Sequence, residues 1–360
     1  MVRLSYIDYF YLSLFSQVQP KKKSTIYHIL QGKKTASILY STEKYQLTHY
    51  FSLFPKLDRM QFNKSIEKMV HLNYLLLSEQ KDAYFLTDEG KNRRLLFFSN
   101  HYYPKQLNFL QDGLALINFW RTIQLITQVL SEIRYKNKNY IPIEKDLEKQ
   151  LWLKQWLKKN KISKQQLAME FGKEWLLILS ELPLLNAEII AANLSGHENT
   201  GKTQKQLAET FKKESIEIHL IVLDSLALIG QIIRKNTLKV PLFCTVYKEM
   251  QLTYEGTTKS ARLTKQYLLD GYSLEEAAKY RNLKSSTVNE HIIEISIMDP
   301  LFDLTTVLPS NKLDEIKQVL KVAPTITYQE LVEKNPEVQF LWYRLAQIEG
   351  SRDSDEPRKN

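Results

Sequence analysis

The stretch Ser260–Ile293, SARLTKQYLLDGYSLEEAAKYRNLKSSTVNEHII, decides the fold of the C-terminal part of this chain. Its spacing predicts a helix, a turn at residues 271–273, a short helix, a second turn near residues 282–285 and a third helix. This is the layout of a helix-turn-helix. Nine apolar residues recur at helical spacing and are expected to close its small core: Leu263, Tyr267, Leu268, Leu274, Ala277, Ala278, Leu283, Val288 and Ile292.

The helix starts in this stretch carry capping signals. Ser273 stands before the short helix with Glu276 three residues later, which is the pattern of a capping box. Ser285 and Ser286 are placed to cap the third helix. The third helix of such a module usually meets the partner, most often DNA in the major groove. The predicted DNA- or partner-binding face of this helix comprises Lys284, Ser285, Ser286, Thr287, Asn289, Glu290 and His291.

Two carboxylates on the third helix bear on the kind of partner. Glu290 and Glu294 would repel phosphates if they faced a DNA groove, so a contact with protein or with single-stranded DNA is as well supported as a duplex contact. His291 can face a partner or pack beside Tyr280, and the pattern favours packing.

The run GYSLEEAAKYRNLKSSTVNEHI resembles the helix-turn-helix domain at the C-terminus of some RecQ-type helicases, and the same domain in the YpbB-like family. The resemblance to the YpbB-like family extends more weakly over the whole chain, while no run resembles the helicase motor. It implies a helicase-associated protein whose partners are a RecQ-type DNA helicase and DNA. The matching positions are Gly271, Ser273, Leu274, Glu275, Ala277, Ala278, Arg281, Leu283, Thr287, Val288 and His291.

Composition places the chain among globular, mainly helical proteins. Its 360 residues are 43% hydrophobic and include only 10 Gly and 11 Pro, and long stretches are rich in Leu, Ile, Lys, Glu and Gln. The single cysteine, Cys244, excludes an internal disulfide and fits a reducing cytosol, so a cytoplasmic location is expected. The N-terminus lacks the pattern of a signal peptide, and no membrane span is expected.

The net charge of +10 is distributed unevenly along the chain. Residues 1–105 hold 16 Lys and Arg against 8 Asp and Glu, whereas residues 257–360 hold 14 against 16. Because DNA-binding modules draw much of their affinity from Lys and Arg, this distribution favours DNA contact by the N-terminal third and a protein-docking role for the C-terminal module. A solvated, solubility-giving surface explains the basic excess equally well.

Residues 1–105 are predicted to form a basic, winged-helix-like domain. Helices are expected at Thr25–Gln31, Thr35–Phe54 and Asn63–Leu72, and Tyr74–Leu77 with Tyr84–Leu86 are expected to form a two-stranded wing. A winged helix used only for protein contact remains an alternative. The residues expected near DNA are Asn63, Lys64 and Lys68 in the third helix and Lys81 in the wing.

Three further regions complete the predicted organisation. Residues 106–256 are expected to form an all-helical scaffold, in which the stripe of Trp152, Leu153, Trp156 and Leu157 is core and not a base-stacking platform. Residues 257–349 form the helix-turn-helix domain. Residues 350–360 are polar and are expected to be a disordered tail.

Gly196–Thr203, GHENTGKT, matches the phosphate-binding loop G-x-x-x-x-G-K-[ST], and Leu220–Asp224 (LIVLD) could supply a metal-binding carboxylate. The context argues against this nucleoside-triphosphatase hypothesis, because the residues before the loop are patterned as a helix and LIVLD continues as a long apolar helix. Under the alternative, the two glycines are turn residues and Thr203 caps TQKQLAETF, the second helix of another small helix-turn-helix.

Other catalytic patterns are not found in the sequence. The seven His residues do not pair with one another or with Cys at metal-ligand spacing, and no Gly-x-Ser-x-Gly occurs. We therefore expect no catalytic residue, metal, cofactor or small-molecule substrate. The expected function is that of a non-enzymatic accessory protein of a RecQ-type helicase in replication, recombination or repair. A helix-turn-helix transcription regulator and a triphosphatase using Lys202 and Thr203 are the alternatives.

Overall fold

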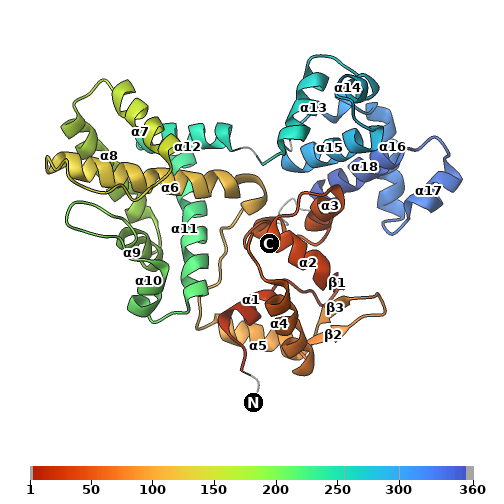
Figure 1. Ribbon diagram of the computed structural model, residues 1–360. Coiled ribbons are helices and arrows are strands. Elements are labelled where there is room, and N and C mark those ends of the chain that lie inside the picture. Colours follow the sequence, from red (N-terminus) through yellow and green to blue (C-terminus); the bar gives the residue numbers. More distant parts are fainter. Residues whose placement is uncertain (1–2, 255, 300, 354–360) are drawn as a thin grey trace. The chain divides into compact units, whose positions relative to one another are not determined.

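The protein is mainly helical, as predicted. The computed structural model describes residues 3–254, 256–299 and 301–353, and eighteen α-helices and three short strands occur in these ranges (Figure 1). The chain divides into two compact units that interleave along the sequence. Unit 1 comprises Met1–Pro20 and Met60–Glu255, and unit 2 comprises Lys21–Arg59 and Gly256–Asn360.

The N-terminal part of unit 1 contains the predicted wing. Its elements are α1 (Tyr6–Leu12), α4 (Arg59–His71), β2 (Leu75–Leu77), β3 (Ala83–Leu86) and α5 (Asp88–Phe98). Strands β2 and β3 pair antiparallel, with Leu75 opposite Leu86 and Leu77 opposite Tyr84, so the predicted hairpin is confirmed. Asp82 in the turn has a φ of 63°, which an aspartate tolerates better than most residues do.

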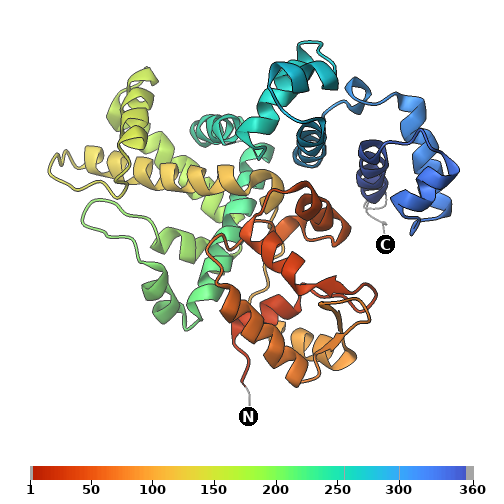
Figure 2. The same ribbon diagram turned by 45° about the vertical axis from the view of Figure 1, so that its right-hand side comes forward.

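The rest of unit 1 is an assembly of seven helices: α6 (Phe109–Arg134), α7 (Leu147–Lys159), α8 (Lys164–Glu181), α9 (Leu184–Ala192), α10 (Gln204–Phe211), α11 (Ser215–Lys235) and α12 (Pro241–Thr253). The long helix α6 crosses α11 and packs against α8 and α12 (Figure 2). Rings from α8 and α12 meet in the core, where Phe171 and Trp175 of α8 contact Phe243 of α12 at centroid distances of 4.7 and 4.9 Å. Leu153 and Trp156 are buried, which confirms their prediction as core residues.

Helix α11 is long and apolar enough to cross a membrane by length and composition alone. Most of its apolar window is buried inside the protein, which is the behaviour of a core helix. Its burial explains the long, largely apolar span in the sequence around LIVLD.

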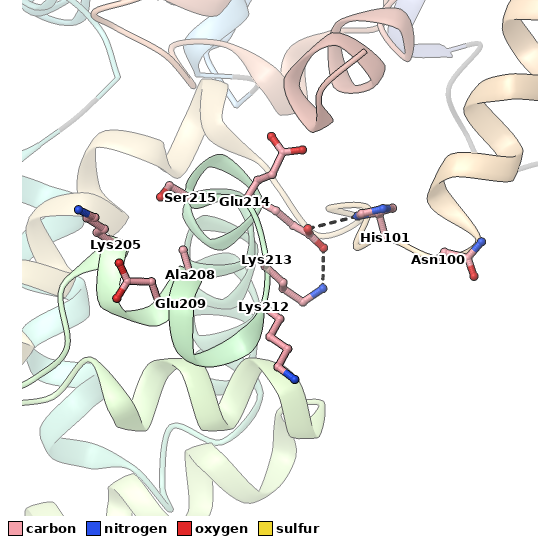
Figure 3. A pocket seen from close by; sticks show the side chains of 10 residues that line it. Asn100, His101, Lys205, Ala208, Glu209, Lys212, Lys213, Glu214 and Ser215 are labelled. Carbon is pink, nitrogen blue, oxygen red and sulfur yellow. Dashed lines mark hydrogen bonds and ion pairs between the residues drawn. The ribbon is translucent and has the colours of Figure 1, made fainter. Parts of the chain in front are cut away.

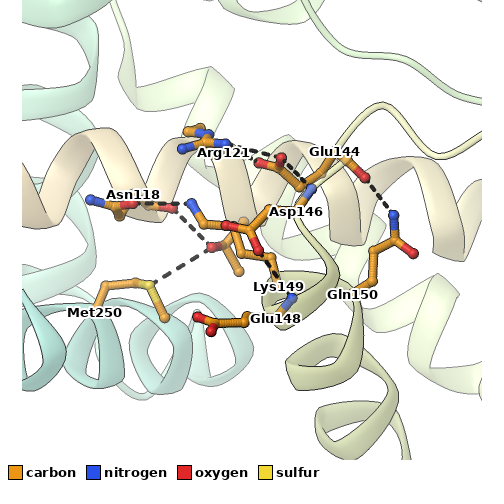
Figure 4. Close-up of polar contacts among 9 residues, drawn as sticks. Asn118, Arg121, Glu144, Asp146, Glu148, Lys149, Gln150 and Met250 are labelled. Carbon is orange, nitrogen blue, oxygen red and sulfur yellow. Dashed lines mark hydrogen bonds and ion pairs between the residues drawn. The ribbon is translucent and has the colours of Figure 1, made fainter.

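Polar side chains join α7 to α6 at the edge of this core (Figure 4). The buried ammonium of Lys149 donates to Asn118 Oδ1 at 3.0 Å, and burial and the nearby Arg121 lower its pKa. Arg121 in turn forms an ion pair with Glu144 at 2.7 Å. The buried polar groups Asn118, Glu144 and Lys149 each have a partner, so the cluster is a structural joint.

Unit 2 begins with the segment Lys21–Arg59. It contains β1 (Lys21–Lys22), α2 (Lys23–Gln31), α3 (Ala36–Lys44) and the 3-10 helix η1 (Thr48–Tyr50). The prediction of one continuous helix over Thr35–Phe54 is wrong, because the chain turns at Gln46 and Ser52, whose φ angles of 54° and 59° are left-handed. The assignment of residues 1–105 to one winged-helix domain stays a prediction, and within it residues 21–59 are grouped with unit 2, although β1 pairs with β3.

The C-terminal part of unit 2 contains α13 (Lys259–Leu269), α14 (Leu274–Tyr280), α15 (Ser285–Met298), η2 (Leu304–Thr306), α16 (Ser310–Val322), α17 (Tyr328–Lys334) and α18 (Phe340–Asp353). Helix α15 is central, since it packs against α3, α13, α14 and α18. Helices α16–α18 share a second core around Ile316, Leu331 and Ala346. Within the predicted disordered tail, residues 350–353 continue α18, and residues 354–360 lie outside the described ranges.

Candidate nucleic-acid interface

Helices α13, α14 and α15 form the helix-turn-helix predicted from the sequence. The Ser273 hydroxyl accepts a hydrogen bond from Glu276 N at 3.2 Å, and Ser273 N donates to the Glu276 carboxylate at 2.8 Å, so the capping box is confirmed. Gly271, with a φ of 90°, ends α13, and Asn282, with a φ of 50°, makes the turn before α15. These two turns fix the angle between the three helices.

Two expectations about this module are wrong. Lys284 and not a serine occupies the N-cap of α15, and it makes no side-chain capping bond, because the helix begins one residue later at Ser285. Leu263 is 56% exposed and lies outside the core, since its place on α13 faces solvent. The alanines of α14 and Val288 and Ile292 of α15 are buried as predicted.

Arg281 is a structural residue of the module. Its guanidinium donates to the Ser260 carbonyl oxygen at 2.8 Å and also bonds the Thr264 hydroxyl, so it ties the end of α14 to α13. The buried His291 continues this network, because its Nδ1 lies 2.8 Å from Thr264 Oγ1. Burial and the nearby Arg281 lower the pKa of His291. The expectation that His291 belongs to the exposed face is therefore wrong, and the favoured packing role is the one observed.

The exposed part of α15 is its first two turns. Lys284, Ser285, Ser286 and Glu290 are exposed, and Thr287 and Asn289 are half-buried. Glu294 does not face a groove: it is buried, and its carboxylate accepts hydrogen bonds from the backbone and hydroxyl of Thr258. Burial raises the pKa of Glu294, although the bonds from Thr258 and the charge of Lys34 oppose the rise. Glu290 is thus the carboxylate of α15 that would face phosphates.

Unit 2 supplies positive charge that the helix-turn-helix itself lacks. The segment 21–59 carries eight Lys and Arg against two Asp and Glu, and its helix α3 packs directly against α15 and α18. Counting charge along the sequence separated this basic segment from the C-terminal module, whereas folding places both in one unit. The exposed cations of the segment are Lys33, Lys44, Lys56 and Arg59.

The second predicted set of binding residues lies in unit 1. Lys64 on α4 and Lys81 at the hairpin turn are exposed, and Asn63 is half-buried. Lys68 is engaged inside the unit, because its ammonium lies 3.5 Å from the buried carboxylate of Asp8. The structure therefore does not gather all predicted residues into one site: those of α4 and the hairpin belong to one unit and those of α15 to the other.

The ion pair of Lys68 has a structural role, because its partner Asp8 is buried. Burial acts to raise the pKa of the Asp8 carboxyl, but hydrogen bonds from Ser65 and Ser5 and the charge of Lys68 outweigh it and lower the pKa. The carboxylate therefore stays ionised at neutral pH and holds α1 to α4.

The phosphate-loop lookalike has a structural role. Gly196–Thr203 follows helix α9 and not a strand, and Thr203 caps α10, with its N–H donating to Gln206 Oε1 at 2.9 Å. Lys202 Nζ donates to Thr210 Oγ1 at 3.0 Å. At Gly201 a Cβ atom would lie 2.4 Å from the Asn193 carbonyl oxygen, so only glycine fits this turn. The predicted turn and capping roles are confirmed.

The aspartate of LIVLD is also structural. Asp224 is buried on α11, where its carboxylate accepts from the Tyr102 hydroxyl at 2.5 Å and from Gln106 N at 2.6 Å. Asn186 donates to the same Tyr102 hydroxyl at 3.1 Å. These bonds clamp the segment after α5 onto α9 and α11 and use the oxygens that a metal would need.

A cleft of about 530 Å³ lies at the turn between α10 and α11 (Figure 3). Glu217, at its base, is buried and accepts from Lys213 Nζ at 2.6 Å and from Tyr102 N at 3.1 Å, and His101 Nδ1 lies 3.3 Å from it. Three lysines and three glutamates line the cleft, so its charges balance: Lys205, Lys212, Lys213, Glu209, Glu214 and Glu217. This balance gives the cleft no preference for an anion or a cation.

Comparison with known proteins agrees with the sequence resemblance. A family described as a helix-turn-helix domain matches residues 260–347. The chain is 24% identical to Protein YpbB of Bacillus subtilis (strain 168) over 349 residues. This alignment covers 95% of this chain and 96% of that protein. The chain is thus similar to YpbB over almost its whole length and carries a C-terminal helix-turn-helix domain. No solved structure gives a significant match.

Proposed function

We propose that this protein is a cytoplasmic, non-enzymatic accessory factor that binds DNA and works with a RecQ-type helicase in replication, recombination or repair. The observation that carries the proposal is the exposed start of α15 on a fully formed helix-turn-helix. In such modules the first residues of the third helix reach the base edges of the major groove. The resemblance of the Gly271–His291 motif to a domain of RecQ-type helicases supports the helicase context.

The chemistry of this face suits DNA better than the sequence alone indicated. Ser285, Ser286 and Asn289 can exchange hydrogen bonds with phosphates or base edges, and Lys284 can neutralise a phosphate. The burial of Glu294 removes one of two expected repulsions. The basic segment 21–59 adds cations to the same unit, which supports a longer phosphate contact.

The proposal is tested with the full-length chain, because deleting residues 1–105 would remove α3 from the core of unit 2. Fluorescence anisotropy measures binding to duplex, forked and single-stranded DNA over a series of salt concentrations. Lys284→Ala is expected to weaken binding and to lower the slope of log K against log salt by about 1. Lys212→Ala, an exposed lysine at the α10–α11 turn, is the matched control and leaves the slope unchanged.

A second contact is tested by Lys64→Ala combined with Lys81→Ala in unit 1. If only this pair weakens binding, DNA meets the wing and α4, and the helix-turn-helix is left for protein contact. If neither set of changes matters, the DNA part of the proposal is wrong.

The helicase part has its own experiment. Unwinding of forked DNA by a RecQ-type helicase is measured with and without the full-length protein, and co-purification of the two is measured in the absence of DNA. We expect a change in unwinding rate that Lys284→Ala reduces. Lys202→Ala is expected to leave all activities intact, because Lys202 has a structural role. A loss of ATP hydrolysis in this variant would instead indicate an enzyme.

A further inference from the structure

Three tyrosines form a ring cluster on the surface of α13, α14 and the turn between them. Tyr272 contacts Tyr280 at a centroid distance of 5.2 Å and Tyr267 at 5.4 Å, and Tyr267 stacks with Tyr280 at 6.4 Å. Tyr280 is 63% exposed and Tyr272 is 38% exposed. Leu263, four residues before Tyr267 on α13, is 56% exposed and extends the same face. We call these four residues the tyrosine patch.

The core of the module does not need this patch. Ala277 and Ala278 of α14 and Leu268 of α13 fill the space between the helices, and all three are buried. The rings thus leave much of their surface in water. Exposed aromatic clusters of this kind are typical of contact surfaces, where tyrosine is among the residues that contribute most to binding.

The charges along the segment that holds the three tyrosines select the partner. Asp270, Glu275 and Glu276 are exposed in the segment between Tyr267 and Tyr280, with Lys279 as the one cation of that segment. Hydrogen bonds from the backbone and the hydroxyl of Ser273 lower the pKa of Glu276. Its charge is therefore retained at neutral pH. This acidic rim repels phosphates and attracts Arg and Lys.

The chain already contains the contact that such a surface offers. In unit 2 the Arg344 guanidinium lies 3.7 Å from the ring centroid of Tyr40 and 5.1 Å from that of Phe340. A guanidinium over an aromatic face is attracted by the electrons of the ring. We infer that the tyrosine patch docks a basic segment of a protein partner, with Arg or Lys side chains lying over the rings and pairing with the acidic rim.

This inference is independent of DNA binding. The patch belongs to α13 and α14, whereas the proposed DNA face belongs to α15. The peptide-binding assay contains no DNA, and oligo-thymidine is tested in a separate measurement, so failure of either proposal is recognised separately.

The test uses the full-length protein and a fluorescent helical peptide built from Arg, Leu and Ala, together with a matched peptide in which Glu replaces Arg. We expect the Arg peptide alone to bind, although the protein has a net charge of +10. Tyr280→Ala is expected to raise its Kd about tenfold. Tyr135→Ala, which alters a tyrosine of the same 63% exposure in unit 1, is expected to leave the Kd unchanged.

Charge reversal gives a second, independent variant. Glu275→Lys is expected to raise the Kd for the Arg peptide, while circular dichroism shows an unchanged helix content. Equal binding of both peptides, or an unchanged Kd in Tyr280→Ala and Glu275→Lys, would overturn the inference. Binding of oligo-thymidine that is lost in Tyr280→Ala would also overturn it, because the patch would then be a base-stacking surface.

Discussion

Two regions of this molecule are built alike and used differently. The α10–α11 pair in unit 1 and the α14–α15 pair in unit 2 share a capping box before the short helix, a left-handed residue in the turn and a serine at the start of the long helix. The shared positions keep one spacing along the chain: Thr203 and Ser273, Gln206 and Glu276, Lys212 and Asn282, Ser215 and Ser285, and Ile218 and Val288.

The difference lies in what covers the long helix where it begins. On α11, Glu214 accepts from Tyr6 N at 2.9 Å and Glu217 accepts from Tyr102 N, so distant segments of unit 1 rest on this face. The corresponding positions on α15 are Lys284, which is exposed, and Thr287, which is half-buried. One helix-turn-helix therefore serves internal packing, and the first turns of the other are left open. The carboxylates of Glu214 and Glu217 hold the covering segments on the first turns of α11.

The largest expected effect comes from removing one of these carboxylates. Glu217→Ala leaves the buried end of Lys213 and the N–H of Tyr102 without an acceptor, so the free energy of unfolding should fall by about 3 kcal/mol. Thr287→Ala, at the corresponding place on α15, should change it by less than about 0.5 kcal/mol. Urea unfolding followed by tryptophan fluorescence measures this in unit 1, which holds four of the five tryptophans. Equal losses in the two variants would contradict the contrast.

The two capping boxes should contribute similarly to the free energy of unfolding in both regions. Thr203→Ala and Ser273→Ala each remove a hydroxyl acceptor at a helix start, and each should cost about 1 kcal/mol. The measurement is the shift in unfolding midpoint, with Ser273→Asp as a variant that keeps an acceptor and restores the cap. A loss confined to Thr203→Ala would show that the covering segments, and not the cap, set the stability of the short helix.

Reversing the charge at the start of the open helix should make it resemble the covered one. Lys284→Glu places a carboxylate where α11 has Glu214, and DNA affinity should fall about fivefold because a phosphate contact is lost and a repulsion added. Anisotropy at fixed salt measures the change. Glu214→Lys in unit 1 is the opposite exchange, and a gain of DNA affinity in that variant would show that charge alone decides which helix can meet DNA.

The smallest effect concerns pH. Because burial and Arg281 lower the pKa of His291 below its usual 6.5, the unfolded chain takes up a proton at a pH at which the folded chain does not. The stability that His291 contributes is thus complete above about pH 6.5 and is lost as the pH falls below it. The covered region has Ile221 at the corresponding place. His291→Leu should weaken the pH dependence of the melting temperature, and a change at the exposed His71 should not.

The sequence predicted local structure well because local signals determine it. The capping box at Ser273, the Thr203 cap, the turns and the period of the apolar residues placed α10, α14 and α15 correctly, and the helical continuation of LIVLD was confirmed. The continuous helix over Thr35–Phe54 was wrong because left-handed turns at Gln46 and Ser52, neither of them glycine, carry no clear sequence signal. Leu263 was wrongly predicted as a core residue, because the apolar period does not show which residues at the edge of a small core stay exposed.

Which face is covered could not be predicted, because the covering residues are distant in sequence. Tyr6 and Tyr102 reach α11 across more than a hundred residues, and α3 reaches α15 across a still longer interval. For the same reason, the charge of segment 21–59 was counted apart from the module with which it folds. The spacing shared by Thr203 and Ser273 was the available signal for the repeated region.

The interleaving of the two units has a consequence for synthesis. The segment 21–59 leaves the ribosome early, but α15 and α18, against which α3 packs, begin only at Ser285 and Phe340, roughly 240 to 300 residues later. At translation rates of about 5 to 20 residues per second this delay is roughly 12 to 60 s. During that time α3 lacks its partners α15 and α18, so the apolar side that they later cover is exposed. We therefore expect this chain to depend on chaperones during synthesis more than a protein whose domains are consecutive. The order of translation, and not only the final contacts, shapes how this chain reaches its fold.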